Sequence, residues 1–279
     1  MKHARNIVTA ITLSGLFIAL SVILQRFLVI PFGMPSLYRL SLGNVPIIMA
    51  SLFLGPIYGA IVGAASDLLG ATLFPVGNFL IWPIISSTLY GIVPWLFLKL
   101  ITLINRNTKF PMLYPFLGVM FIILELFIFL NNEVRHPFDK TLPPLVFTTG
   151  VRIIFTAVMI ILIIGLILIF HYLEKRYKNV VETRYTGTPT ELAFSILLMA
   201  LVVDVLYSSW WKMHAFGSDF LVSVFFHTAI MFILLPLQTS ILAILGNVYA
   251  KSSVARMLGE PFKKEVMGSE TNETENSEK

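Results

Sequence analysis

Long apolar runs, each close to the length of a membrane-spanning helix, constrain this chain more than any other feature. They recur between short polar segments over most of the 279 residues. A helix of about 20 apolar residues crosses the hydrocarbon core of a bilayer, and it satisfies its backbone hydrogen bonds internally. Composition agrees, since 57% of the residues are hydrophobic and 13% are charged, against about 25% charged in soluble domains. The sequence therefore predicts an all-α, multi-pass protein of the cytoplasmic membrane.

About eight spans are expected. The run 44–53 is the exception in length, because its roughly ten residues fit a tilted, broken or re-entrant helix as well as a full crossing. If both chain ends lie inside the cell, most Lys and Arg residues near helix ends also lie inside. The positive-inside rule therefore favours this orientation, with the N-terminus and the C-terminus both inside. The expected runs cover residues 7–28, 44–53, 54–73, 79–104, 113–130, 145–172, 191–210 and 220–249.

Several classes of chemistry are excluded by what the chain lacks. It has no cysteine, so it forms no disulfide and no thiolate site. Its five histidines form no HxxxH or HExxH pair, and no metal site is expected. Neither GxxxxGKS/T nor GxGxxG occurs, so ATP hydrolysis by this chain itself is not expected. The net charge of +5 lies mostly in loops that flank helices, which reports membrane topology rather than nucleic-acid binding.

Four glycines line one face of the helix predicted for residues 54–73. At about 100° per residue, Gly55, Gly59, Gly63 and Gly70 fall within an arc of about 120° that ends at Asp67. Small residues at this spacing let two helix backbones approach closely in lipid, so a packing seam is the simplest interpretation. An acid at this depth costs about 2.5–3.5 kcal/mol on insertion scales, and we expect Asp67 to face a neighbouring helix or a cavity.

Three segments expected on the outer side, 29–44, 74–83 and 207–220, carry polar and aromatic groups that suit ligand binding. Together they predict an outward-facing pocket for a planar, partly anionic small molecule. Blander interpretations remain open, namely a snorkelling interfacial arginine and an aromatic belt of tryptophans. The candidate residues in these segments are Arg39, Ser41, Asn44, Phe74, Asn78, Trp82, Trp210 and Trp211.

A motif-rich block over residues 39–77 resembles the S components of energy-coupling factor (ECF) vitamin transporters, most closely the folate branch. The shared pattern is Arg-x-Ser-x-Gly, a nearby proline, Gly-Pro, spaced glycines and Asp-Leu-Leu-Gly. Residues 226–245 are similar to the last helix of that family, with its Pro-x-Gln-Thr motif. In the first block the pattern is carried by Arg39, Ser41, Gly43, Pro46, Gly55, Pro56, Gly59, Gly63, Asp67, Leu68, Leu69 and Gly70.

The resemblance implies a substrate-binding membrane subunit, without catalysis or a catalytic cofactor, that captures a folate-like vitamin from the outer side. It also implies association with a transmembrane coupling (T) subunit and two cytosolic ATPase subunits, whose ATP hydrolysis drives release inside. Gly15 and Ala19 match the family's Ala-x-x-x-Ala docking motif, although internal helix packing explains the pair equally well. With the resemblance, the expected ligand-binding set also includes Asp67, His227 and Gln238.

The stretch 106–190 departs from the six-helix pattern of that family. It carries two predicted spans, and an inserted helix pair returns the chain to the same side of the membrane. We therefore expect residues 1–105 to form the first four helices of the core, 106–190 an insertion and 191–250 the last two helices. Residues 251–279 have too few apolar side chains to fold and are expected to form a largely disordered cytosolic tail.

Two alternatives remain open. Within the same family, the ligand could be pantothenate, riboflavin, a queuosine precursor or a thiamin-like compound. In a different class, the chain could be a membrane-scaffold protein or an autonomous secondary carrier, and a carrier would use charged groups in or near the spans as a proton or ion relay. The groups available for such a relay are Asp67, Glu125, Arg152 and Asp204.

Overall fold

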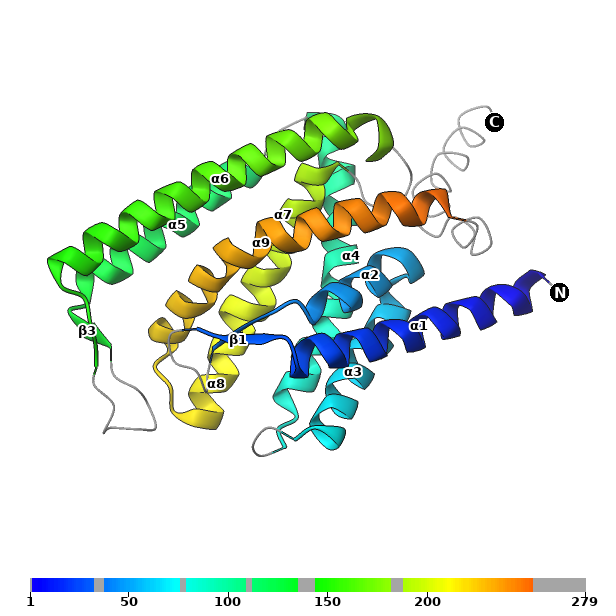
Figure 1. Ribbon diagram of the computed structural model, residues 1–279, viewed down its shortest axis with the longest axis horizontal. Helices are drawn as coiled ribbons and strands as arrows, with labels where there is room; N and C mark the ends of the chain where they lie inside the picture. Colours follow the sequence, from blue (N-terminus) through cyan, green and yellow to red (C-terminus); the bar gives the residue numbers. More distant parts are fainter. Residues whose placement is uncertain are drawn as a thin grey trace, which may run out of the picture.

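The computed structural model describes residues 2–32, 38–75, 79–108, 112–134, 144–181 and 188–252. Helices make up most of these ranges, together with two short antiparallel strand pairs (Figure 1). The helices are α1 (Lys2–Arg26), α2 (Asn44–Leu54), α3 (Pro56–Leu73), α4 (Trp82–Thr108), α5 (Leu113–Leu130), α6 (Thr149–Val181), α7 (Pro189–Ala200), the π-helix η1 (Leu201–Ser208), α8 (Ser209–Phe216) and α9 (Phe220–Lys251). The strands are β1 (Val29–Pro31), paired with β2 (Arg39–Ser41), and β3 (Glu133–Val134), paired with β4 (Leu145–Val146).

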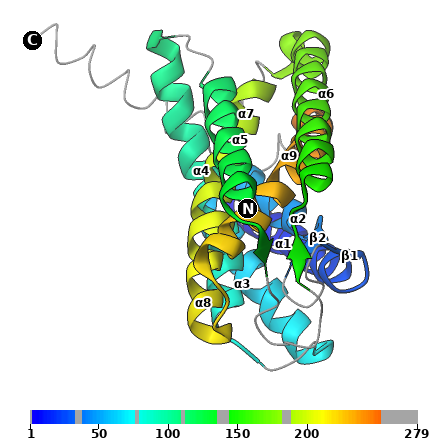
Figure 2. The same cartoon turned by 90° about the vertical axis from the view of Figure 1, so that its left-hand side faces the viewer.

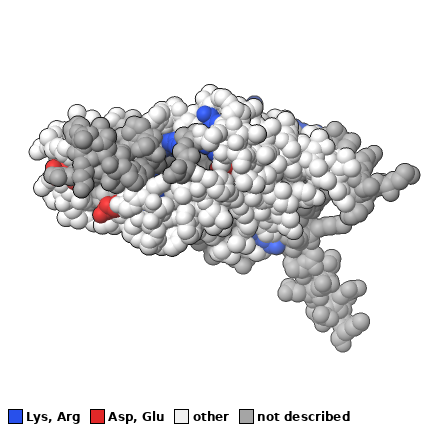
Figure 3. Space-filling view, turned by 90° about the horizontal axis from the view of Figure 1, so that it is seen from below, with Lys and Arg blue, Asp and Glu red and all other residues white. Residues whose placement is uncertain are grey.

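The outer surface of the helices suits a lipid environment. Seven helical spans among the described residues are long and apolar enough to cross a membrane. Much of their apolar surface faces outward, and in α6 only 17% of the most apolar stretch is buried. Figure 3 shows one face of the molecule, on which charged side chains are few and scattered. The prediction of an all-α, multi-pass membrane protein is confirmed.

Helix α2 is the apolar helix that falls short of a full span. Its 11 residues rise roughly 16 Å, about half of the hydrocarbon thickness. It lies in the protein interior, with residues 45–53 all buried. Gly55 separates α2 from α3 with a positive φ of 99°, a conformation that favours glycine. A Cβ added to Gly55 would meet no atom within 4 Å, so this glycine interrupts the helix instead of packing against a neighbour.

Helices α3 and α4 pack backbone against backbone along the glycine face of α3. A Cβ added to Gly59 would collide with the carbonyl oxygen of Gly91, and one added to Gly63 would collide with that of Ser87. Any larger residue at these positions would force the two helices apart. The close packing of α3 and α4 also fixes the shape of a cavity, because both helices contribute to its wall.

Helices α7, η1 and α8 form one continuous span, Pro189–Phe216. A capping box starts it: the Thr188 side chain accepts a hydrogen bond from the backbone N–H of Glu191, and the Glu191 carboxylate accepts one from the N–H of Thr188. The middle of the span, η1, is a π-helix, a form that occurs frequently at functional sites. The next helix, α9, is capped by the side chain of Asp219.

Helices α5 and α6 lie side by side and pack against α7 and α9 (Figures 1 and 2). One polar contact joins them within the membrane-spanning region, where the Thr156 hydroxyl donates to Oε2 of Glu125 at 2.7 Å. The pair falls within the stretch 106–190, whose status as an insertion stays a prediction, as does the orientation with both ends inside. Beyond residue 252, the predicted tail 251–279 lies outside the described residues.

Candidate functional site

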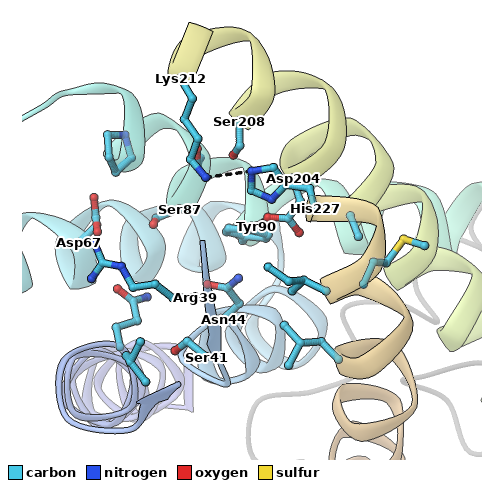
Figure 4. A pocket seen from close by; sticks show the side chains of 18 of the residues that line it. Arg39, Ser41, Asn44, Asp67, Ser87, Tyr90, Asp204, Ser208, Lys212 and His227 are labelled. Carbon is cyan, nitrogen blue, oxygen red and sulfur yellow. Dashed lines mark hydrogen bonds between the residues drawn. The ribbon is translucent and has the colours of Figure 1, made fainter. Parts of the chain in front are cut away.

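A cavity of about 840 Å³ lies between the helices of the N-terminal half and those of the C-terminal half. Its lining comes from α1, β2, α2, α3 and α4 on one side and from α7, η1, α8 and α9 on the other. None of the described residues of α5 or α6 lines it. The cavity is therefore formed by segments far apart in the sequence, and polar side chains gather at two of its ends (Figure 4).

The first end, which we call the arginine pole, consists of Arg26, Arg39 and Asp67. The Nη2 atom of Arg26 lies 3.9 Å from Oδ1 of Asp67. The Arg26 side chain also packs closely over Gly70, because a Cβ added to Gly70 would lie 2.8 Å from Nε of Arg26. Arg39 comes from β2 and points towards Asp67 (Figure 4). Its guanidinium makes no hydrogen bond within the described part of the chain. Two guanidinium groups face one carboxylate, so this pole suits an anionic ligand.

The charge of Arg39 is a permanent property of the cavity. The side chain is exposed because it faces the cavity, although protein atoms surround it on the other sides. Burial and the positive charge of Arg26 lower the pKa of Arg39 from its ordinary value, and the negative charge of Asp67 opposes this change. Because arginine starts from a pKa above 12, the group stays protonated at neutral pH.

The second end, which we call the lysine pole, consists of Tyr90, Asp204, Lys212 and His227. The Nζ atom of Lys212 lies 2.9 Å from Nε2 of His227, and the Tyr90 hydroxyl donates a hydrogen bond to Oδ1 of Asp204. Lys212 is 7% exposed and His227 9%. Asp204 and Lys212 are close enough to attract each other electrostatically. In Figure 4 these four residues lie together, across the cavity from Asp67.

Tyr38 contacts the lysine pole. Its ring centre lies 4.6 Å from Nζ of Lys212, a distance at which a cation is attracted to an aromatic face. The ring stacks on Phe226 with the centroids 4.6 Å apart, and the hydroxyl lies 2.8 Å from Oγ of Ser223. Burial raises the pKa of Tyr38 above its ordinary value, so its side chain stays neutral at physiological pH.

Apolar and aromatic side chains line the space around the two poles. Trp211 is 7% exposed, and its ring offers a flat apolar face to a bound molecule. No group of three or more His, Cys, Asp or Glu side chains is arranged to hold a metal ion among the residues that the structure describes. The larger members of this lining are Phe79, Trp211, Phe216, Ile230, Met231, Leu234 and Leu235.

The structure brings most of the predicted ligand-binding residues together. Those that line the cavity are Arg39, Ser41, Asn44, Asp67, Trp211, His227 and Gln238. Three aromatic candidates do not line it. The ring of Phe74 packs against Phe27, with centroids 5.1 Å apart, and the ring of Trp82 packs against Trp210 at 5.4 Å. Asn78 lies outside the described residues. The part that each candidate takes in binding stays a prediction.

Four residues of the two poles were absent from the predicted ligand-binding set, namely Arg26, Tyr90, Asp204 and Lys212. Asp204 gave a signal, since an acid inside an apolar span marks a functional position, but only the carrier alternative used it. Lys212 follows a tryptophan pair, so the sequence alone places it just beyond the end of a membrane-spanning helix. Tyr90 gives no signal in the sequence, because one tyrosine in an apolar helix is ordinary.

The predicted docking pair lies away from the cavity. Gly15 and Ala19 are exposed on α1, and a Cβ added to Gly15 would meet no atom within 4 Å. Neither residue therefore packs the interior of this chain. The surface they share is open to lipid or to another membrane helix.

Comparisons with known proteins agree with the geometry. A family model described as ECF-type riboflavin transporter, S component, matches residues 5–175. The folate transporter FolT of Clostridium novyi (strain NT) is 33% identical over 79 residues, which are 27% of this chain and 44% of that protein. The matched region thus spans less than half of the relative's length. No solved structure gives a significant match.

Proposed function

The chain belongs to the S-component family of ECF-type riboflavin transporters, and we propose that it binds folate, or another flat vitamin with an anionic group, in the cavity. The observation that carries this proposal is the arginine pole, where Arg26 and Arg39 face a single carboxylate. A guanidinium group binds a carboxylate through two parallel hydrogen bonds. The second carboxylate needed to balance this pole would come from the ligand.

The size and walls of the cavity support the same ligand class. Its volume of about 840 Å³ falls within the range of small-molecule sites. Trp211, Phe79 and Phe216 supply aromatic faces on which a flat ring can stack. The similarity to a folate transporter favours a ligand that combines such a ring with carboxylate groups.

We infer that this chain supplies binding and that partner subunits supply energy. A T subunit would contact the exposed face of α1 at Gly15 and Ala19, where small residues allow close approach of a second helix. Two cytosolic ATPase subunits would drive reorientation of the loaded chain and release of the vitamin. No residue of this chain takes part in a chemical step in this scheme.

Riboflavin is the second candidate ligand, because the matching family is described by it. Riboflavin carries no charge at neutral pH, so its binding would leave the positive charge of the arginine pole unbalanced. Sensitivity to Arg39→Ala therefore separates the two ligands, with a large loss for folate and a small one for riboflavin.

Titration of the detergent-purified chain with folate and, separately, with riboflavin tests the proposal. We expect folate binding with a dissociation constant on the order of 1 nM, about −12 kcal/mol. Emission of the buried Trp211 should change, and the unfolding temperature should rise with folate concentration. Native mass spectrometry of the freshly extracted chain should find the same molecule bound. Unchanged emission and an unchanged unfolding temperature in micromolar folate would refute the folate assignment.

Uptake assays separate the coupled subunit from an autonomous carrier. In cells that lack the T and ATPase subunits, we expect the chain to bind vitamin without net uptake. Accumulation of labelled folate in those cells would instead favour a secondary carrier, with Asp67 and Asp204 as relay groups.

A further inference from the structure

The role proposed for the arginine pole leaves the lysine pole unexplained, although burying its polar side chains costs free energy. Lys212 and His227 are more than nine-tenths buried at membrane depth, where charged and polar side chains are tolerated chiefly when they serve a pathway or a ligand. Both side chains nevertheless line the cavity. Their position points to contact with a bound molecule.

Asp204 offers the hydrogen-bond acceptor of this pole. It is half-buried and lines the cavity, and the Tyr90 hydroxyl donates to its Oδ1 atom. Across that bond, Asn44 lies close to the Tyr90 hydroxyl (Figure 4). An ionised carboxylate accepts several hydrogen bonds and donates none, so Asp204 suits the N–H groups of a ligand.

Lys212 offers the complementary donor. Its ammonium group can donate hydrogen bonds but accept none. His227, at 2.9 Å, and the Tyr38 ring, at 4.6 Å, hold the ammonium group in place. Because Lys212 and Asp204 sit at the same end of the cavity (Figure 4), a ligand edge that enters there meets an acceptor and a donor together.

We propose that the lysine pole binds the edge of a flat heterocycle on which an N–H group stands next to a carbonyl oxygen. Asp204 accepts from the N–H group, and Lys212 donates to the carbonyl oxygen. This inference rests on the proposed function, because it assigns the ring and the anionic group of one ligand to opposite ends of one cavity. The anionic group then points to Arg39 at the arginine pole.

Two ring systems have the required edge. The pterin ring of folate and the isoalloxazine ring of riboflavin both carry an N–H group beside a carbonyl oxygen. Only folate also carries carboxylates at its far end. The lysine pole therefore accounts for recognition of either ring, while the arginine pole distinguishes between the two ligands.

Fragments of folate test the assignment in the full, detergent-purified chain by titration calorimetry. Pteroate keeps the ring and lacks the glutamate, whereas p-aminobenzoylglutamate keeps the carboxylates and lacks the ring. We expect Asp204→Asn to weaken binding of folate and of pteroate by about tenfold or more. The affinity of the Asp204→Asn variant for p-aminobenzoylglutamate should stay within about twofold of the wild-type value. Lys212→Met should give the same pattern.

The fragment without the ring also reports folding, because a misfolded variant would lose it as well. A matched control is Glu125→Gln, which changes a carboxylate to an amide in α5, away from the cavity lining. This control should leave all three affinities unchanged. Equal losses for folate and p-aminobenzoylglutamate in both pole variants, or no loss of folate binding in either, would overturn the assignment.

The wild-type chain separates this inference from the proposed function. If it binds riboflavin and not folate, the folate proposal fails, and Asp204→Asn and Lys212→Met must then weaken riboflavin binding for the ring-edge assignment to hold. Binding of folate with no selective loss in the variants overturns the assignment alone. Binding of neither vitamin by the wild-type chain overturns both.

Discussion

Two pairs of membrane-spanning helices are held together in different ways. Helices α3 and α4 touch through their backbones at Gly59 and Gly63, whereas a Cβ added to Gly118 in α5 or Gly165 in α6 would meet no atom within 4 Å. The first pair lines the cavity, and no described residue of the second pair does. Backbone contact leaves little freedom to shift, so the tight seam occurs where the geometry of a binding site has to be fixed.

The largest effect is expected from adding methyl groups to the tight seam. The double variant Gly59→Ala, Gly63→Ala forces two Cβ atoms into the carbonyl oxygens of Gly91 and Ser87. We expect a loss of about 3 kcal/mol or more in unfolding free energy, since overpacking at each site costs about 1–3 kcal/mol. Ligand affinity should fall as well, because α3 and α4 would separate. Thermal unfolding in detergent, followed by ligand titration, measures both.

Helices α5 and α6 supply the matched control. Gly118→Ala and Gly165→Ala add the same two methyl groups where there is open space. We therefore expect no loss of unfolding free energy, and a gain of about 0.5–1 kcal/mol per site because alanine favours the helix over glycine. Comparable destabilisation by the two double variants would mean that the seam between α3 and α4 is no more constrained than the pair α5 and α6.

The second prediction compares an arginine that lines the cavity, Arg39, with an arginine on α6, Arg152. Arg39→Ala should lower the affinity for an anionic ligand by about 1–3 kcal/mol, as for a lost charged hydrogen bond, and leave stability nearly unchanged. Arg152, on α6, instead donates to Oδ1 of Asn132 at 2.8 Å and to the carbonyl of Phe147 at 3.1 Å. Arg152→Ala should therefore reduce stability and leave ligand affinity intact. Loss of affinity in both variants would link α6 to the site.

A third prediction concerns Gly15, a glycine with open space around it for which we propose a role in docking. Gly15 resembles Gly118 and Gly165, because a Cβ at each would meet nothing within 4 Å. Replacing Gly15 and Ala19 by Leu should weaken association with the T subunit by more than about 1 kcal/mol while ligand binding persists. Co-purification of the complex measures the first and titration the second. Leucine at Gly118 and Gly165 should leave association unchanged, and equal losses would contradict a specific docking face.

The smallest effect is expected for the polar contact between α5 and α6. Thr156→Val removes the hydroxyl that donates to Glu125 at 2.7 Å. Hydrogen bonds between membrane helices contribute about 0.6 kcal/mol on average, so the unfolding free energy should fall by about that amount. Ligand affinity should not change. A loss several times larger would show that this pair depends on its polar contact far more than on side-chain packing.

The fold was more predictable from the sequence than the site. Apolar runs near 20 residues long have few alternatives to a spanning helix, so the helices were found with small errors at their ends. The glycine spacing on α3 also predicted a packing face, because only small residues allow such contact. The span predicted to end at residue 210 continues instead to Phe216, and this continuation carries Lys212 into the cavity.

The poles of the cavity depend on contacts between distant segments. Arg26 follows an apolar run, so the sequence suggests only a charged residue at the end of a helix. In the structure its side chain reaches Asp67 on α3. In the same way, Trp82 and Trp210 look like ligand-stacking residues but pack against each other. Local pattern identifies which residues are unusual for a membrane helix. It does not identify the partner that a given side chain will meet.

The π-helix η1 gives the protein a way to change one wall without rebuilding the rest. Each π turn takes up about one residue more than an α turn, because its hydrogen bonds run from residue i to i+5. A chain one residue shorter in Leu201–Ser208 would run through this segment as an α-helix and still present α8 to nearly the same side, because the wider turn had absorbed the extra residue. Trp211 and Lys212 would keep their places in the cavity, and only the side chains along η1 would be respaced. This wall can therefore gain or lose one residue with no change of fold.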